Sequence, residues 1–454
     1  MRGILASSIG VTCAAALALP LAPPATAAAA RPAPTAEAAT RAAMTAPPDV
    51  PGSTQSLPLR PLTRDRASGA TVLGLGPQAV RHFSLLGVVW DDPDAELAGR
   101  VQVRTRSVAT WDWSDWQDLE THYTDHGADP GTSEAASGQV RGATAPLWVG
   151  ESDGVELRVR PEARKSGAGA VPELPSGLRL ELIDPGDGAA DSREAVDGRR
   201  GPATATASAA SAANARLAAP GAAEIPALNG EQTRREFLAL RGVELTSEQR
   251  AKPYIGPRPS IVTRRGWGAD EGLREGGFVY TSKVKAAFVH HTASGNKYSC
   301  SQAPSLIRGF YRYHVRSLGW RDIGYNFLID KCGRIYEGRA GGVAKPVKGA
   351  HTRGFNSKTT GIAVIGSYGS KKPSSSAVKA VARLTAWKLG LHGKNPRAKT
   401  YLTSGGGNLY RKGKKVRLNV ISGHRDGFNT SCPGGKLYKK LGTVRSTAAR
   451  YQGR

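Results

Sequence analysis

Residues able to bind a metal occur in two short stretches of the C-terminal half of the sequence. Residues 423–433 read GHRDGFNTSCP and contain His424 and Cys432, whereas residues 288–292 read FVHHT and contain His290. Two imidazoles and one thiolate would hold zinc with one coordination position left open, which is typical of a catalytic site and not of a closed structural site. Together the stretches predict a catalytic zinc site with the ligands His290, His424 and Cys432.

Each candidate histidine follows an alternating apolar run. Residues 285–289 lead to His290, and residues 416–421 lead to His424. Such runs predict strands, so we expect both histidines at strand ends. A single histidine in a loop is more often a packed or surface residue, and it is the shared position at two strand ends that favours the metal site.

The basic residues are concentrated in the C-terminal part of this 454-residue chain, which has room for two or three domains. Residues 251–454 contain 39 Lys and Arg against 7 Asp and Glu, a net charge of +32, whereas the first 250 residues carry 24 against 30, a net charge of −6. Such a field attracts polyanions. Because the basic residues are dispersed and show no recognition-helix or zinc-finger spacing, the pattern favours an anionic membrane surface or acidic wall polymer over nucleic acid.

The N-terminus has the features of a secretory signal peptide. Arg2 precedes an apolar run over residues 4–21, and small residues follow from residue 25 onward. We assign residues 1–30 to the signal peptide and expect the protein to be exported. No later stretch approaches ~18 consecutive apolar residues, so we expect no transmembrane segment.

Three cysteines remain after the predicted signal peptide, namely Cys300, Cys332 and Cys432. In an oxidising compartment an odd number leaves one thiol over, and binding to a metal would account for it. If Cys432 is the metal ligand, Cys300 pairs with Cys332. The two pairings that use Cys432 would remove that ligand, and the sequence alone leaves them open.

The first half of the chain reads as a β domain between two segments of low complexity. Residues 57–185 contain short alternating apolar runs separated by turn residues, which predict an antiparallel β-sandwich-like domain. Trp111, Trp113 and Trp116 lie at near-alternate positions, where they would either stack on sugar rings or pack in the core. We expect a disordered leader over residues 31–56 and a flexible linker over residues 186–258, with a short helix at residues 247–251.

Strand and helix patterns alternate through residues 259–454. Strands are expected to end at His290 and at residue 421, with a hairpin over residues 323–337 and a buried strand at residues 361–367. Helices are predicted over residues 303–316 and 374–391, followed by a closing helix from residue 437. This order predicts an α/β domain with a central mixed sheet flanked by helices.

Six short blocks of this domain resemble, in order, the peptidoglycan recognition protein and type 2 N-acetylmuramoyl-L-alanine amidase family, in a secreted bacterial form. The blocks are FVHHT at 288–292, GWRDIGYNF at 319–327, YEGR at 336–339, GAHTRGFN at 349–356, GIAV at 361–364 and the stretch 423–433. The resemblance covers residues 259–454 and leaves the β domain unexplained.

The resemblance implies Zn²⁺ held by His290, His424 and Cys432, and hydrolysis of the amide between N-acetylmuramic acid and L-alanine in cell-wall peptidoglycan. Tyr325 matches the family's catalytic tyrosine, and Thr430 matches a position beside the metal that would share its work. Four further residues resemble those lining the substrate groove: His291, Trp320, Arg339 and His351. The implied partners are peptidoglycan and anionic cell-wall polymers. We expect the protein to be an extracellular, wall-associated monomer.

The sequence departs from the family's pattern at two places. Ala363 stands where cytoplasmic members carry a glutamate, so a general base is missing there, and Glu337 is a lesser candidate whose structural role is favoured. Residues 340–348 form a longer segment than animal recognition proteins have, so a stem-peptide preference does not carry over. The alternative function is a recognition protein that binds peptidoglycan without cutting it, and Cys432 favours the enzyme.

Overall fold

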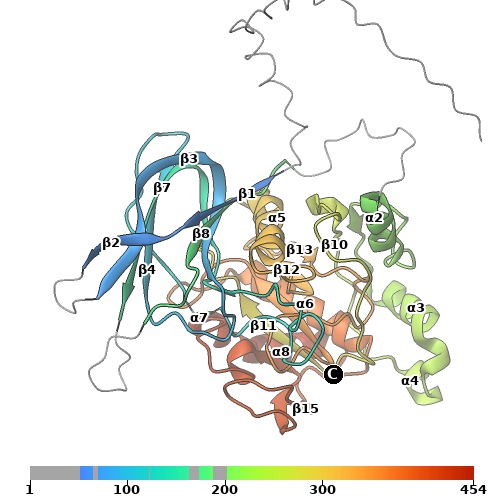
Figure 1. The fold of residues 1–454 in the computed structure, drawn as a ribbon. Helices are drawn as coiled ribbons and strands as arrows, with labels where there is room; N and C mark the ends of the chain where they lie inside the picture. Colours follow the sequence, from blue (N-terminus) through green and yellow to red (C-terminus); the bar gives the residue numbers. More distant parts are fainter. Residues whose placement is uncertain (1–51, 65–69, 122, 163–172, 188–201) are drawn as a thin grey trace, which may run out of the picture. The chain divides into compact units, whose positions relative to one another are not determined.

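The computed structural model describes residues 52–64, 70–121, 123–162, 173–187 and 202–454 (Figure 1). All of them belong to one compact unit, Val50–Arg454. The predicted signal peptide and residues 31–51 of the predicted leader lie outside the described residues. Residues 53–56, which were predicted to be disordered, instead belong to a strand, because their main chain pairs with residues 181–184. Among the helices that are described, none has the length and apolar character needed to cross a bilayer.

The first domain is an eight-stranded sheet in which every pairing is antiparallel. The longest strand is β3 (Thr71–Trp90). Its second half pairs with β8 (Arg179–Asp184) and β6 (Gly142–Ala143), whereas its first half pairs with β2 (Arg60–Arg64). Register shifts interrupt the pairing of β3 with β7 (Leu147–Pro161) between these halves. The two long strands therefore serve two layers, which agrees with the predicted β-sandwich-like domain. The strand order is β1 (Ser53–Pro58), β8 (Arg179–Asp184), β3 (Thr71–Trp90), β7 (Leu147–Pro161), β4 (Gly99–Ser107) and β5 (Gln117–Leu119), with β2 (Arg60–Arg64) and β6 (Gly142–Ala143) on β3.

The tryptophan row of this domain lies near its surface. Trp111 is 66% exposed. An arginine guanidinium lies over each ring, with Arg158 4.0 Å from the ring centre of Trp116. None of the three indoles belongs to the buried core of the domain, which favours the surface role of the two predicted alternatives.

The second domain is built on a seven-stranded mixed sheet, as predicted. The four strands at one side of the sheet, ending with β12 (Phe327–Ile329), are parallel to one another. The hairpin from β12 to β13 (Ile335–Glu337) reverses the strand direction. The strand order is β17 (Ile421–Gly423), β11 (Ala286–His291), β14 (Thr359–Val364), β12 (Phe327–Ile329), β13 (Ile335–Glu337), β10 (Ile261–Val262) and β9 (Glu224–Ile225). A separate hairpin joins β15 (Lys399–Thr403) to β16 (Lys415–Asn419).

Helices cover both faces of this sheet because alternate strand residues point to opposite sides. Phe327 and Ile329 belong to the core shared with α6 (Ser375–Gly390) and α8 (Leu441–Tyr451). Leu328 belongs to the other core, shared with α5 (Ala303–Arg312). The Ser374 hydroxyl accepts the N–H of Ala377 and caps α6 as predicted. Shorter helices are α7 (Gly435–Tyr438), η1 (Gly242–Glu244), η2 (Arg265–Trp267), η3 (Cys300–Gln302), η4 (Tyr313–Ser317) and η5 (His424–Asp426).

The second half of β3 packs the two domains together. The side chains of Leu86, Val88 and Trp90 belong to the core of the β domain. The side chains of Leu85 and Val89, on the opposite face of the strand, belong to the core that contains α5. Figure 1 shows α5 beside the β domain, and its contacts with β3 and β8 are direct. A strand buried on both faces reads as a continuous apolar run, which explains the sequence LLGVVW at 85–90.

The predicted flexible linker is corrected by the structure over residues 202–258. This part forms α2 (Pro202–Ala212), α3 (Gly230–Arg241) and the predicted short helix α4 (Ser247–Ala251). Alanine is the strongest helix former, so an Ala-rich stretch folds as a helix once it has a surface to pack on. In α2 the side chain of Ala210 is buried, and farther along Ile225 and Phe237 are buried in the core with α6. Residues 188–201 of the predicted linker lie outside the described residues.

The predicted disulfide between Cys300 and Cys332 is present, and Cys432 is free and buried. The bond closes a loop with a sequence separation of 32 residues. We expect the Cys300→Ala, Cys332→Ala double variant to lose about 3 to 4 kcal/mol of unfolding free energy, because the unfolded chain gains the entropy of the open loop. Urea unfolding of parent and variant measures the loss, and coincident midpoints would contradict it.

Candidate metal centre

The sheet brings the two predicted histidine ligands together. Strands β11 and β17 are parallel neighbours with Val289 opposite Gly423, so His290 and His424 leave the same edge of the sheet side by side. Their ring centres are 4.5 Å apart, and both side chains are fully buried. The prediction that both lie at strand ends is confirmed.

Cys432 returns to this edge from the loop that follows η5. Its main-chain carbonyl accepts the N–H of Arg425, and its own N–H donates to the Thr430 hydroxyl. The thiol Sγ lies 3.8 Å from His290 Nδ1 and is buried. The three predicted metal ligands therefore converge.

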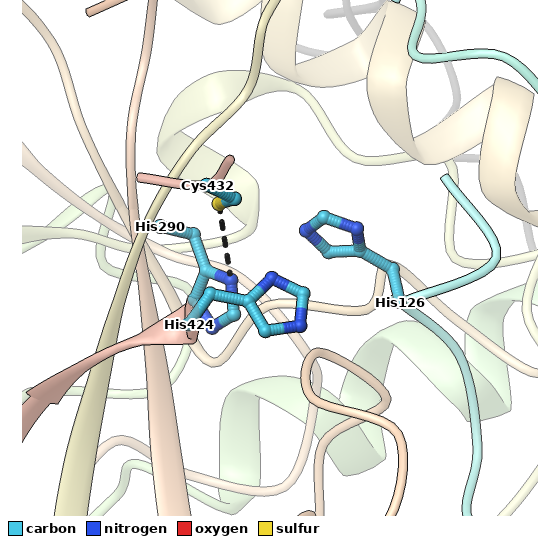
Figure 2. A group of neighbouring side chains, drawn as sticks. All are labelled: His126, His290, His424 and Cys432. Atoms are coloured by element: carbon cyan, nitrogen blue, oxygen red, sulfur yellow. Dashed lines mark hydrogen bonds between the residues drawn. The ribbon is translucent and has the colours of Figure 1, made fainter. Parts of the chain in front are cut away.

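A third histidine joins this group from the β domain. Figure 2 shows the ring of His126 directed at the three predicted ligands. One ligand atom from each of His126, His290, His424 and Cys432 lies within 4.8 Å of all the others, and all four residues are buried. Three imidazole nitrogens and one sulfur match the donor sets that bind zinc in proteins.

The hydrogen bonds leave two lone pairs free at the centre of the group. His424 Nε2 lies 3.1 Å from the main-chain carbonyl oxygen of Asp125, which can only accept, so the proton is on Nε2 and Nδ1 has a lone pair. His126 Nδ1 lies 2.6 Å from an Asp125 carboxylate oxygen, so Nε2 is the ring nitrogen left for a metal. Both free nitrogens are buried without a hydrogen-bond partner among the described residues. Such orphaned acceptors fit a bound cation.

Burial sets the protonation of the group. It holds the pKa of His290 well below its ordinary value and lowers the pKa of His424 to about 3, so both rings are neutral, as metal ligands must be. Burial also raises the pKa of the Cys432 thiol well above its ordinary value. A bound cation would supply the charge that a thiolate needs here.

Tyr325 and Thr430 border the group. The Tyr325 ring centre is 5.5 Å from that of His290, and its hydroxyl is 3.4 Å from the hydroxyl of Tyr123. Burial holds the pKa of Tyr325 well above its ordinary value, so the phenol keeps its proton and can donate it. Thr430 holds the loop that carries Cys432.

All four predicted groove residues are buried, and of these His351 contacts the group directly while Trp320 and Arg339 contact other residues. His291 Nδ1 accepts the main-chain N–H of Tyr368, and His351 Nδ1 lies 3.3 Å from His290 Nε2 behind the centre. Trp320 stacks on His314 with ring centres 4.5 Å apart. Arg339 forms two hydrogen bonds of 2.8 and 2.9 Å with the carboxylate of Glu134 in the β domain.

Sequence reasoning missed His126 and Asp125. They precede the candidate ligands His290, His424 and Cys432 by more than 160 residues and follow no motif that links them to the zinc pattern. The signal available was the charge contrast between an acidic first half and a basic second half that contains the other ligands.

Glu337 lies apart from the metal group and has a structural role. Both of its carboxylate oxygens accept hydrogen bonds of 2.9 Å from the Asn214 amide, and one also accepts the main-chain N–H of Arg264. Burial raises its pKa from 4.5 to about 7, so the native state binds this proton more tightly than the unfolded chain does.

The raised pKa of Glu337 predicts a loss of stability as pH rises. The contribution of Glu337 to the free energy of unfolding is fully present below pH 4.5 and is lost as pH rises through 7, a change on the order of 3 kcal/mol. Glu337→Gln removes the titration, so the unfolding free energy of the variant relative to the parent should rise between pH 5 and 8. Denaturant unfolding across that range checks it, with the exposed Glu151→Gln as control. Parallel pH curves for parent and Glu337→Gln would contradict it.

Comparison with known proteins separates the two domains. Residues 35–177 match the family described as Rv3811 N-terminal galactose-binding domain-like, and residues 280–435 match N-acetylmuramoyl-L-alanine amidase. Peptidoglycan-recognition protein 1 of Holotrichia diomphalia is 33% identical over 184 residues, 40% of this chain and 79% of that protein. Peptidoglycan recognition protein 1 of Bos indicus is 33% identical over 186 residues, 40% of this chain and 81% of that protein. The solved structure of Drosophila PGRP-LB is 26% identical, with a TM-score of 0.31 over 40% of this chain and 92% of that one.

Proposed function

Because the chain belongs to the peptidoglycan recognition protein and type 2 amidase family, we propose that it is a zinc-dependent N-acetylmuramoyl-L-alanine amidase. The observation that carries this proposal is the convergence of His290, His424 and Cys432 beside Tyr325. A module that only binds peptidoglycan has no need of a thiol and two neutral imidazoles in one buried place.

In this proposal His290, His424 and Cys432 hold the zinc. When bound, zinc supplies a Lewis acid for the amide carbonyl and a water nucleophile that is active near neutral pH. The carbonyl carbon gains the oxygen of water, the C–N bond to L-alanine breaks, and a proton passes to the leaving nitrogen. The Tyr325 phenol donates a hydrogen bond to the developing oxyanion. The Thr430 hydroxyl keeps Cys432 in position and assists at the same edge.

The same proposal gives His291, Trp320, Arg339 and His351 roles in binding the substrate. Trp320 offers an aromatic face for a sugar or peptide, and Arg339 offers a guanidinium for a carboxylate of the stem peptide. His351 lies behind His290 and orients it through the contact between their ring nitrogens.

A non-catalytic recognition protein is the second candidate function. The curated relatives named above are recognition proteins, which favours it. Cys432 and the neutral imidazoles of His290 and His424 favour the amidase, since binding a peptide requires neither.

We further propose that the protein is secreted and works at the cell wall as a monomer. The signal-like N-terminus and the disulfide support export. The net charge of +32 over residues 251–454 supports attraction to anionic wall polymers.

Wall binding by the full chain is expected to weaken with salt more steeply than the cleavage of a soluble fragment. Salt shortens the Debye length from about 10 Å at 0.1 M to about 3 Å at 1 M, whereas chemistry inside a buried site acts at short range. Sedimentation with purified walls and cleavage of a soluble muropeptide, each across a salt series, measure the two effects. Equal salt dependence would contradict the separation.

The amidase proposal is tested by zinc content together with product identity. Metal-free and zinc-restored protein are incubated with a soluble muropeptide, and mass spectrometry identifies the products. One zinc per chain, and a released stem peptide that begins with L-alanine only after zinc is restored, is the expected result. Binding of the muropeptide without cleavage at full zinc occupancy, in the parent chain and in His126→Ala alike, would establish the recognition protein instead.

A further inference from the structure

A segment of the β domain lies on the candidate active site. We define the covering segment as residues 123–140, which follow β5 and precede β6. The His126 ring stacks on Tyr123 with centres 4.5 Å apart and presents its edge to His424 at 4.5 Å and to Tyr325 at 5.7 Å. The segment thus fills the space directly in front of the predicted catalytic groups.

The covering segment occupies the residues predicted to bind substrate. Tyr123 lies parallel to Trp320, with ring centres 6.2 Å apart, and its hydroxyl is 2.6 Å from His314 Nε2. Glu134 pairs with Arg339 through two hydrogen bonds, with both side chains at least nine-tenths buried. The aromatic face and the guanidinium proposed for the substrate are therefore already engaged.

Hydrogen bonds from main-chain and side-chain groups fasten the covering segment to the second domain. The Asp129 carboxylate accepts the N–H of Gly354 at 2.9 Å and the side-chain amide of Asn356 at 2.8 Å. Gly127 donates its N–H to Ala350 and accepts a bond from Asn356. These bonds hold the segment as an added layer of the second domain and not as a loose loop.

Charge favours this arrangement. The covering segment contains Asp125, Asp129 and Glu134 and no lysine or arginine, whereas residues 251–454 have a net charge of +32. Lys348 lies 3.7 Å from Asp129, and Arg353 forms an ion pair with Asp94 of the same β domain. The segment presents its carboxylates to cations that would otherwise face an anionic ligand.

The opening that remains beside His126 is small. A cavity of about 230 Å³ is lined by residues that include Tyr123, His126, Trp320 and Arg353. Pockets for small organic ligands usually measure about 300–1,000 Å³. His126 borders this cavity, but His290, His424 and Cys432 do not, so the cavity does not lead past His126 to the three predicted ligands.

From these contacts we infer that His126 is a fourth protein ligand of the metal and that the covering segment holds the chain in a self-inhibited form. Three imidazoles and one thiolate complete a tetrahedral zinc shell, so no position is left for water or substrate. Asp125 orients the His126 ring from its other nitrogen. The inference rests on the proposed amidase function, and displacement of the segment converts the closed site into the open three-ligand site.

Cobalt(II) in place of zinc reports the coordination directly, with azide as the probe of an open position. In the full chain we expect azide to leave the visible absorption bands of bound cobalt unchanged. In His126→Ala, and in His126→Gln as a second variant of similar volume, azide should shift them. The exposed His82→Ala is the matched control and should behave as the parent. Cleavage of a soluble muropeptide should be at least ~10-fold faster in the His126 variants, since a closed form above 90% leaves under a tenth of the chains competent.

The outcomes separate the inference from the function on which it rests. If azide alters the parent spectrum as much as that of the variants, His126 is not a ligand and the inference is overturned while the amidase proposal stands. Slower cleavage by folded, metal-loaded His126 variants would also overturn it, because the segment would then contribute to catalysis. If neither parent nor variants bind cobalt, the metal site itself is lost and both proposals fall.

Discussion

Cys432→Ser is expected to weaken zinc binding by about 100-fold or more and to abolish amide cleavage. Loss of groups that only support a ligand already costs 10- to 100-fold in metal affinity, and here the ligand itself is lost. The thiolate is also the only anionic donor of the group, so its removal leaves neutral imidazoles around a divalent ion. The buried position of Cys432 next to His290 gives serine no alternative partner that restores this charge.

The Cys432→Ser measurement needs two readouts because His126 remains. Competition with a chromogenic chelator gives the zinc dissociation constant, and thermal unfolding of the metal-free forms shows that the fold is retained. Ser375→Ala, at the exposed start of α6, serves as the control. The combined His126→Ala, Cys432→Ser variant should lose zinc further and stay inactive. Cleavage by either Cys432 variant at a rate near that of the parent would refute the assigned ligand set.

Glu134→Ala is expected to release the covering segment. Removing one partner of a buried ion pair costs about 3 to 5 kcal/mol when the other is left without water. Here the Arg339 guanidinium is hydrated again when the covering segment opens. The lost ion-pair energy therefore lowers the free energy needed to open the segment. A change of about 3 kcal/mol corresponds to roughly 100-fold more frequent opening. Cleavage of soluble muropeptide should rise with it.

Amide hydrogen exchange follows this opening residue by residue. The N–H groups of Gly127 and Gly354 are bonded across the contact, to Ala350 and Asp129 respectively. Both should exchange much faster in Glu134→Ala, while amides of the central strand β11 should keep their protection. Glu151→Ala, which removes an exposed carboxylate of the same domain, should change neither. Unchanged exchange at Gly127 and Gly354 would show that the ion pair does not hold the segment.

The sequence allowed the second domain and the convergence of its candidate metal ligands to be predicted because their signals are local. Apolar runs before His290 and His424 specify strands, and the odd cysteine count set Cys432 apart from Cys300 and Cys332. Parallel pairing of β11 with β17 then brings the histidines together without further information.

The remaining features depend on contacts between distant parts of the chain. Residues 202–258 have the composition of a linker, yet Ile225 and Phe237 find places in the core beside α6. The continuous apolar run of β3 indicates a strand buried on both faces, but it does not indicate that one face packs against the second domain. Asp125 and His126 carry no spacing signal, since only the docking of the β domain brings them to the metal group.

Mass spectrometry of a soluble muropeptide incubated in ¹⁸O-labelled water with the zinc-loaded full chain carrying His126→Ala tests the amidase account most directly. We expect one ¹⁸O atom in the new carboxylate on the N-acetylmuramic acid side and an unlabelled stem peptide with a free L-alanine amine. With metal-free protein, no labelled product should form. Folded, zinc-loaded protein that leaves the muropeptide intact, or cleaves it at another bond, would contradict the account.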